Sequence, residues 1–269
     1  MDHDEILTTQ RWLWSLGDYA AMARRMAPIA ELTVARLELR GGERVLDVAT
    51  GDGNAAVAAA RAGAAVTGVD LCPEQLDLAR SRMSVEGVDV TLVEGDAQAL
   101  DFPDGSFDAV VSSLGAMFAP DAELAARELA RVCRAGGRVA VASWTDEGWM
   151  GTWRRLLPER LGTGSVPASP SFAWQDPDVV RDRLRTAGID ATTEVHELMW
   201  RFDDAAQGAD FYLANSAPFV ALAASLESDE RRAEARGLII ELLEEADVSG
   251  GERCDVPSSW ILASGPRTG

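Results

Sequence analysis

The sequence contains no lysine, two histidines and three cysteines among its 269 residues. Cys72, Cys133 and Cys254 show no paired spacing, and two histidines do not complete a usual zinc site with them, so we expect free thiols in a reducing cytosol. The 25 basic residues, all Arg, face 44 acidic ones, which gives a net charge of −19. This negative field disfavours a nucleic-acid substrate, because it repels a phosphate backbone and no basic run offers a local exception.

Long apolar runs are also missing, since none approaches the roughly 18 residues that a membrane-spanning helix needs. The amino terminus reads MDHDEILTTQRWLW, which is acidic where a secretory signal peptide is positively charged. We therefore expect a cytoplasmic protein. Its expected partners are small molecules, without nucleic acid or membrane, and a homodimer stays open.

Over about the first 145 positions, strand and helix patterns alternate. Helical spacing predicts two helices within residues 4–39, with a break at Gly17 and Asp18. Apolar runs predict strands over residues 44–48, 65–69, 88–93, 107–112 and 138–143, and helical patterns cover residues 54–62, 73–85 and 122–134. Strands separated by helices indicate an α/β fold with a doubly wound, mostly parallel sheet.

Beyond residue 145 the pattern changes. Residues 147–174 mix Trp, Gly, Pro and Ser without a clear period, which predicts a loop-rich cap. Further patterns predict a helix over 176–187, a strand over 192–202, helices over 205–226 and 229–247 and a last strand over 258–263. We expect a helical segment (1–39), a core (40–145) and a cap with the last strands (146–269), all within one domain.

A glycine turn, VLDVATGDGNAA (residues 45–56), joins the first core strand to its helix. Glycine at such a place lets the backbone approach a ligand closely. Residues 51–56 also satisfy the G-x-G-x-x-G/A dinucleotide pattern, and Asp70 at the end of the next strand would suit its ribose-binding carboxylate. A nicotinamide dinucleotide (NAD) is therefore one candidate ligand.

Charge separates the candidate nucleotides. A pyrophosphate needs helix-terminal N–H groups without nearby anions, whereas this turn carries Asp47 and Asp52. S-adenosylmethionine has an ammonium and a sulfonium, which carboxylates attract. Asp70 can accept hydrogen bonds from two ribose hydroxyls, and Asp96 after the third core strand can lie near an adenine amine. The sequence therefore favours S-adenosylmethionine, bound at the carboxyl ends of the strands.

These segments resemble the class I S-adenosylmethionine-dependent methyltransferases, particularly the small-molecule branch that includes the ubiquinone and menaquinone biosynthesis type. The resemblance covers about residues 40–145 and is carried, in order, by VLDVATGDGNAA, VTGVDL, VEGDAQALDFPDGSFDAVVSS and ELARVCRAGGRVAVASW. It implies a Rossmann-like methyltransferase fold, in which two final strands, one of them antiparallel, complete a seven-stranded sheet. Residues 40–145 would then be the cofactor-binding core.

The resemblance also implies roles for residues. It assigns the methionine portion of the cofactor to Asp47 and the glycine turn, the ribose to Asp70, and the adenine to Asp96 and Ala97. The set expected to bind the cofactor is Asp47, Thr50, Gly51, Gly53, Asp70, Leu71, Asp96, Ala97, Ser112 and Ser113. Asp52 departs from the family, which often has Thr or another small polar residue there, and it could cap the following helix.

The acceptor side is less clearly marked. The tryptophans after the fifth core strand are either core residues or the roof of an apolar acceptor pocket. Tyr19 and His196 are the candidate catalytic residues, although Tyr19 could equally be core and we favour a surface or structural role for His196. The acceptor pocket that we expect comprises Tyr19, Met22, Met117, Phe118, Trp144, Trp149, Trp153 and Trp174.

The expected reaction is transfer of a methyl group to oxygen, nitrogen or carbon of a small organic acceptor, promoted mainly by proximity and orientation. Residues 112–120 lack the Asn/Asp-Pro-Pro-aromatic motif of nucleic-acid amino-methyltransferases, and no carboxylate set of the catechol type is recognisable, so we expect no metal. Three alternatives stay open: an enzyme that uses the same cofactor for rearrangement or cyclisation, an NAD-dependent oxidoreductase, and a non-catalytic interaction protein.

Overall fold

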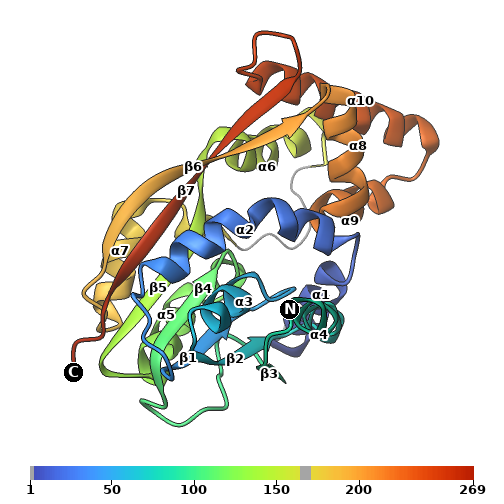
Figure 1. The fold of residues 1–269 in the computed structure, drawn as a ribbon. Coiled ribbons are helices and arrows are strands. Elements are labelled where there is room, and N and C mark those ends of the chain that lie inside the picture. The colour runs from blue at the N-terminus through green and yellow to red at the C-terminus, as the bar shows by residue number, and fades with distance from the viewer. Residues whose placement is uncertain (1–2, 164–170) are drawn as a thin grey trace. The chain divides into compact units, whose positions relative to one another are not determined.

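The computed structural model describes residues 3–163 and 171–269. Within them, seven strands form one sheet in the order β3-β2-β1-β4-β5-β7-β6, with β7 antiparallel (Figure 1). The strands are β1 (Arg44–Val48), β2 (Ala65–Asp70), β3 (Val90–Glu94), β4 (Phe107–Ser113), β5 (Cys133–Glu147), β6 (Thr192–Phe202) and β7 (Cys254–Pro266). The predicted seven-stranded, doubly wound fold is confirmed.

Helices connect and cover these strands. They are α1 (His3–Trp14), α2 (Tyr19–Ala35), α3 (Asn54–Arg61), α4 (Pro73–Glu86), α5 (Ala122–Val132), α6 (Gly148–Leu161), α7 (Pro177–Thr186), α8 (Ala205–Asn215), α9 (Ala217–Ser225) and α10 (Asp229–Ala246), with short 3-10 helices η1 (Ala116–Phe118) and η2 (Ser171–Trp174). No helix of the described residues is long and apolar enough to cross a membrane.

The chain divides into two compact units, which we call the aromatic unit and the sheet unit. The aromatic unit contains residues 1–25, 144–169 and 197–260. The sheet unit contains residues 26–143, 170–196 and 261–269. Along the chain, β5, β6 and β7 each begin in one unit and end in the other.

The sheet unit brings the carboxyl ends of its first strands to one edge. β1 pairs in parallel with β2 and β4, and β2 pairs in parallel with β3. In this register Asp47 lies opposite Gly68 and Asp70 lies opposite Glu94. Three acidic residues at successive strand ends therefore meet at the same edge, as parallel pairing requires.

Small side chains bring the helices of the sheet unit close to the strands. Ala55, Ala56 and Ala59 of α3 are buried in one core cluster with Val45 of β1 and Val111 of β4, and residues of α2 and α4 belong to the same cluster. α5 packs on β4 and against α7. Alanine leaves room for close helix–sheet packing, so the first turn of α3 lies directly beyond the end of β1.

The aromatic unit is built from helices around touching rings. Its aromatic cluster consists of Trp149, Trp153, Trp200, Tyr212 and Phe219, whose neighbouring ring centroids lie 4.3–6.4 Å apart. All five side chains are buried. Helix α10 packs against α6 and α8, and α8 packs against α9. Large aromatic surfaces thus provide most of the core of this unit.

The loop-rich cap expected over residues 147–174 is wrong in its first half, because residues 148–161 form helix α6. Gly148, Gly162 and Pro158 suggested loops. In the structure Gly148 begins the helix with a φ of 70°, Gly162 ends it with a φ of 66°, and Pro158 lies inside its last turn. Gly151 is needed because a Cβ there would overlap the backbone of Asp146. The glycines of this segment therefore belong to a helix and its ends, and do not mark a loop.

The single helix expected over residues 205–226 is also divided, into α8 and α9, at Ser216. Pro218 in the first turn of α9 cannot donate the N–H that a continuous helix needs. Strands β5 and β7 extend beyond the expected residues 138–143 and 258–263, and β3 begins at Val90. Helix α2 ends at Ala35, before the expected end at residue 39. The other predicted elements agree within about two residues, as boundary assignments normally do.

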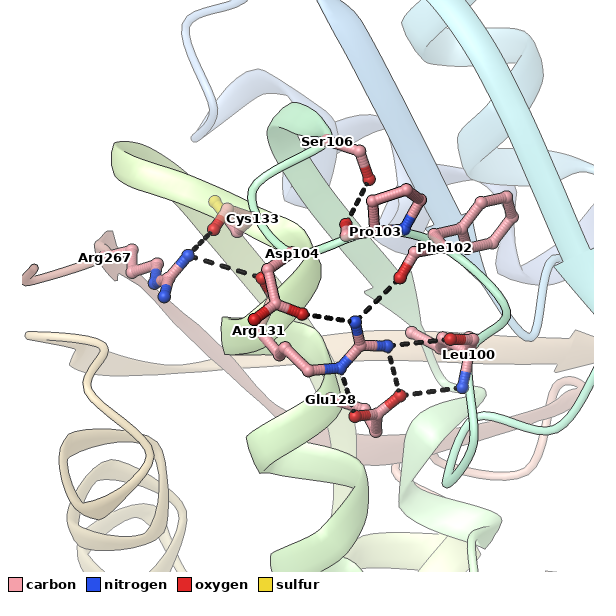
Figure 2. A network of polar contacts seen from close by, with 9 residues as sticks. All are labelled: Leu100, Phe102, Pro103, Asp104, Ser106, Glu128, Arg131, Cys133 and Arg267. Atoms are coloured by element: carbon pink, nitrogen blue, oxygen red, sulfur yellow. Dashed lines mark hydrogen bonds and ion pairs between the residues drawn. The ribbon is translucent and has the colours of Figure 1, made fainter.

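Arg131 of α5 holds the connection between β3 and β4 (Figure 2). Its guanidinium donates to the carbonyl oxygens of Leu100 and Phe102, both at 2.7 Å, and to Asp104 Oδ1 at 2.8 Å. Glu128 accepts two further bonds from the same guanidinium, at 2.6 and 2.7 Å, and one from the Leu100 backbone N–H. These bonds fix the path by which the chain returns from Asp96 to the sheet.

Candidate functional site

Asp47 lies at the end of β1 and caps the helix that follows the glycine turn. Its Oδ2 accepts a hydrogen bond from Thr50 Oγ1 at 2.6 Å and one from the Ala56 backbone N–H at 2.9 Å. Gly53, at the N-cap position of α3, contributes no side-chain bond. Asp47 therefore stabilises the first turn of α3, and no donor among the described residues hydrogen-bonds to its Oδ1.

Asp70 at the end of β2 holds the other side of the turn. Its Oδ2 accepts from the Gly51 N–H at 2.8 Å and its Oδ1 accepts from the Cys72 N–H at 2.9 Å. Gly51 and Gly53 have φ values of 56° and 90°, in the left-handed region where glycine is favoured. The Leu71 backbone N–H also bonds to this carboxylate, so three donors use its roughly four acceptor sites and about one site is left for another donor.

The turn therefore differs from a phosphate cradle. A cradle presents free backbone N–H groups to the ligand, whereas here the N–H groups of Gly51 and Ala56 already donate to carboxylates. The arrangement suits a cationic ligand with hydroxyl groups better than a pyrophosphate.

Burial changes the protonation of both carboxylates. It raises the pKa of Asp47 to about 7, with smaller contributions from the nearby Asp70 and Asp52, while the bonds from Thr50 and Ala56 oppose the rise. Burial also raises the pKa of Asp70, against hydrogen bonds from backbone N–H groups that include those of Cys72 and Gly51. Near neutral pH Asp47 is therefore balanced between its neutral and charged forms, and a cation beside it would favour the charged form.

Asp52, which sequence offered as a possible cap of the following helix, has a charged partner in the sheet unit. It forms an ion pair with Arg82 of α4, with Nη1 of Arg82 2.9 Å from Oδ2 of Asp52. The same nitrogen donates to Asn54 Oδ1 at 2.6 Å. The charge of Asp52 is thus compensated locally, so the argument from charge depends on Asp47 and Asp70.

The turns after β1 and β4 pack against each other. Ser112 is fully buried, and its hydroxyl donates to the Val48 carbonyl and accepts from the Ala116 N–H, at 2.7 and 2.8 Å. A Cβ at Gly115 would lie 2.6 Å from the Ala49 carbonyl oxygen. Ser112 therefore positions η1 beside the glycine turn, while Ser113 is only partly buried.

The turn after β3 is closed by its own side chains. Asp96 Oδ1 accepts a bond from the Gln98 backbone N–H at 2.9 Å, and the Gln98 amide reaches back to both oxygens of Asp96. Gln98 Oε1 in turn accepts the Asp121 N–H at 2.8 Å. Ala97 is partly buried within this turn, and Leu71 is partly buried beside Asp70.

The expected acceptor residues are distributed over both units. Met117, Phe118 and Trp174 belong to the sheet unit, where Met117 and Trp174 are buried and Phe118 is partly exposed. The aromatic unit contains the other five, Tyr19, Met22, Trp144, Trp149 and Trp153. Of these, Trp149 and Trp153 are core residues of the aromatic cluster. The edge of Tyr19 faces Trp14, with ring centroids 6.2 Å apart.

His196 has a surface environment on β6. Its Nε2 lies 3.2 Å from Glu194 Oε2, and Glu194 also pairs with Arg36. His196 and Glu194 therefore lie on the same face of β6. Glu194 and Arg36 are not members of the cofactor set, so these contacts favour the surface role over catalysis.

Several contributors escaped the sequence analysis. Arg82 completes the turn after β1 by binding Asp52, which lies 30 residues away in the sequence. Gln98 completes the turn after β3 by binding Asp96, which lies 2 residues away. Ala49 and Leu114 adopt positive φ values of 55° and 59°, which sequence does not signal for these residue types. Of these features, only the spacing of Asp96 and Gln98 could be recognised in the sequence as a turn signal. Among the described residues, no group of three His, Cys, Asp or Glu side chains could hold a metal ion.

Known proteins resemble this chain at several levels. Residues 46–141 match the family described as Methyltransferase domain. An uncharacterised protein of Mycobacterium tuberculosis is 39% identical over 218 residues, which cover 80% of this chain and 79% of that protein. Demethylmenaquinone methyltransferase of Thermus thermophilus is 44% identical over 101 residues, which cover 37% of this chain and 46% of that enzyme. The likeness to the menaquinone type is therefore partial.

Solved structures share the fold. The YcgJ protein from Bacillus subtilis superposes with a TM-score of 0.64 at 21% sequence identity, covering 90% of this chain and 98% of that one.

Proposed function

The chain belongs to the class I S-adenosylmethionine-dependent methyltransferase family, and from this premise we propose that it methylates a small organic acceptor at oxygen, nitrogen or carbon. One observation supports S-adenosylmethionine, and not a dinucleotide, as the ligand of the glycine turn. Asp47 and Asp70 occupy the N–H groups of the glycine turn and of α3 that a dinucleotide pyrophosphate would require.

The residues at the strand ends fit the cofactor by charge and shape. Asp47 Oδ1 would accept the ammonium of the methionine portion, and the remaining acceptor site of Asp70 would accept a ribose hydroxyl. Asp96 and Ala97 would border the adenine, beside Leu71 and Ser113. Thr50 and Ser112 would act indirectly, by holding Asp47 and η1 in position.

S-adenosylmethionine would supply a methyl group already activated by the positive sulfonium. The new bond forms between the acceptor nucleophile and the methyl carbon while the carbon–sulfur bond breaks, and its electron pair stays on sulfur. The protein's contribution is to hold the two reactants in line, which can provide effective molarities of roughly 10⁵–10⁸ M. Such a reaction needs no metal, and we assign no general base.

Within the sheet unit, the acceptor would contact Phe118, Met117 or Trp174. The acceptor roles predicted from sequence for the residues of the aromatic unit stay predictions. The net charge of −19 favours a cationic cofactor and disfavours strongly anionic acceptors. A neutral, largely apolar organic molecule meets both conditions.

Calorimetric titration with S-adenosylhomocysteine and with NADH tests the cofactor. We expect the first to bind and the second not to bind. Asp70→Ala should weaken S-adenosylhomocysteine binding by roughly 1–3 kcal/mol, because the ribose would lose its buried acceptor. Asp108→Asn is the matched control, since Asp108 pairs with Arg134 and Arg44 outside the site.

Methyl-labelled donor and a metabolite extract then test the reaction. Label that moves to a small acceptor supports methyl transfer. A substrate that changes while the label stays on the donor would contradict it and favour rearrangement or cyclisation chemistry, and NADH binding without S-adenosylhomocysteine binding would favour an oxidoreductase.

A further inference from the structure

Two neighbouring residues of the sheet unit bury N–H donors that have no hydrogen-bond partner within residues 3–163 and 171–269. They are the indole nitrogen Nε1 of Trp174 and the amide nitrogen Nε2 of Gln175. The Trp174 side chain is 0% exposed and Gln175 is 4% exposed. A buried donor without a partner costs roughly 1–3 kcal/mol, so two such groups side by side in the chain need an explanation.

Trp174 is held firmly in place by the surrounding structure. Its backbone carbonyl accepts a bond from Ser143 Oγ of β5 at 2.7 Å. The guanidinium of Arg183 lies over the indole ring, 5.2 Å from its centroid, and also donates to the Ala173 carbonyl. Because ring and backbone are both fixed, the indole N–H cannot easily turn away to reach another partner.

This segment packs beside the elements that follow β4. Helix η2, which ends at Trp174, contacts η1. The first residue of η1, Ala116, is tied through Ser112 to the Val48 carbonyl at the end of β1. Trp174 and Gln175 therefore belong to the same sheet edge as the glycine turn, all within the sheet unit.

We propose that Trp174 and Gln175 form the polar end of the acceptor site, where their N–H groups donate to uncharged oxygen atoms of the acceptor, such as those of a ketone, ester or amide. This inference rests on the proposed methyltransferase function and specifies its substrate class. The acceptor must present hydrogen-bond-accepting atoms there because both groups are donors, and a carbonyl oxygen, with two lone pairs, can accept from both.

An uncharged oxygen fits better than a carboxylate or phosphate. The cation nearest to these residues, Arg183, already pairs with Glu123, with Nη2 of Arg183 3.0 Å from Oε1 of Glu123. Without a spare positive charge, and in a chain with a net charge of −19, an anionic group would be bound against the field of the protein. Two neutral donors can hold a carbonyl oxygen without that cost.

Nuclear magnetic resonance of the protein saturated with S-adenosylhomocysteine tests the proposal with two matched probes. 4-Hydroxyacetophenone and 4-ethylphenol have similar sizes and differ in one carbonyl oxygen. The indole ¹⁵N–¹H resonance of Trp174 is assigned by its absence in Trp174→Phe. We expect the ketone to shift this resonance and the ethyl compound to leave it in place, and Gln175→Leu to weaken ketone binding up to roughly tenfold.

Stability measurements separate a ligand-binding role from a structural one. Gln175→Leu should leave the melting temperature of the free protein unchanged or raise it, because an unpaired buried amide is replaced by an apolar side chain of similar size. Gln98→Leu is the matched control and should lower it, since the amide of Gln98 is fully used by Asp96 and Asp121.

Equal shifts by the two probes, no shift by either, or a fall in melting temperature for Gln175→Leu like that of Gln98→Leu would each overturn the proposal. Failure of the methyltransferase function is recognised separately, because it would appear as absent S-adenosylhomocysteine binding before any probe is added.

Discussion

The glycine turn and the aromatic cluster treat their buried polar groups in opposite ways. In the turn, Asp47 accepts two hydrogen bonds, and Asp70 accepts bonds from the backbone N–H groups of Gly51, Leu71 and Cys72. In the cluster, the indole N–H groups of Trp149 and Trp153 and the hydroxyl of Tyr212 are buried without a hydrogen-bond partner in the part of the chain that the structure describes. The indole of Trp149 faces the Tyr212 hydroxyl without reaching hydrogen-bond geometry.

The difference shows two ways of making a fixed structure. The turn is shaped by directed bonds to charged groups, so its geometry exists without a ligand and its energy depends on protonation. The cluster is held by the area of its rings, and burial raises the pKa of Tyr212 well above its ordinary value, which keeps the hydroxyl neutral. Substitutions should therefore act through pH in the first region and through packing in the second.

The largest expected effect is in the cluster. Trp153→Ala should lower the free energy of unfolding by roughly 3–5 kcal/mol, because it removes a buried ring that lies 4.3 Å from the ring centroid of Phe219. Chemical denaturation measures the change. Trp12→Ala is the control and should be nearly neutral, since Trp12 is 49% exposed. A similar small loss for both variants would show that Trp153 is not a core residue.

The second effect concerns the turn and changes with pH. The pKa of Asp47 is about 7 in the folded protein and 3.8 as the ordinary value, so the folded state binds the proton more tightly. The contribution of Asp47 to stability is therefore complete below pH 3.8 and is lost as pH rises to about 7. Asp47→Asn should be more stable than the original protein at pH 8, by up to about 4 kcal/mol.

Denaturation at pH 4 and pH 8 provides the measurement for Asp47→Asn, with Asp108→Asn as the control. At pH 4 the variant and the original protein should have nearly equal stability. A variant that is less stable at pH 8 would mean that the charged form of Asp47 is already favoured without a ligand.

A smaller effect is expected when the hydroxyl of Thr50, which lies beside Asp47, is removed. Thr50→Val removes the donor 2.6 Å from Asp47 Oδ2 with little change of shape. The loss should be roughly 1.5–3 kcal/mol at pH 8, as for a hydrogen bond to a charged group, and less at pH 5. In a double-mutant cycle with Asp47→Asn, the coupling between the two sites should shrink as pH falls. A coupling that is independent of pH would contradict the ionisation of Asp47.

The smallest expected effect concerns the cysteines, which should not react with a thiol reagent. Cys254 lies in the aromatic unit and Cys72 and Cys133 lie in the sheet unit, all three as buried free thiols. Burial raises the pKa of each to about 11, so a thiol reagent at pH 8 should label none of them in the folded protein. Mass spectrometry after brief exposure checks this. Rapid labelling of Cys254 alone would show that the aromatic unit opens independently.

Sequence predicted best the parts that are specified locally. Residues 44–48 and 192–202 form the expected strands without change of boundary, because short apolar or alternating runs bounded by turn residues define them. The edge at which we propose the cofactor binds could be predicted from the order of strands and from Asp47 and Asp70, since parallel pairing brings successive strand ends together.

What sequence missed depends on distant contacts or on ambiguous residues. Asp52 pairs with Arg82, which lies 30 residues away in the sequence, and no residue near Asp52 indicates this pairing. In α6, Trp149, Trp153 and Leu157 recur at helical spacing, yet the nearby Gly and Pro residues obscured that pattern. The same segment contains the rings whose role was left undecided, because local pattern does not tell core from pocket.

The Arg131 network has a consequence for how the sequence around it can change. All five N–H groups of the guanidinium are used, and two of them bind backbone carbonyls, at Leu100 and Phe102. A backbone carbonyl is present whatever the side chain, so these two anchoring bonds do not depend on the side chains at the two positions. They depend on Arg131, because a lysine ammonium could not span the same acceptors. The anchoring of the connection between β3 and β4 thus depends mainly on one residue of helix α5, Arg131.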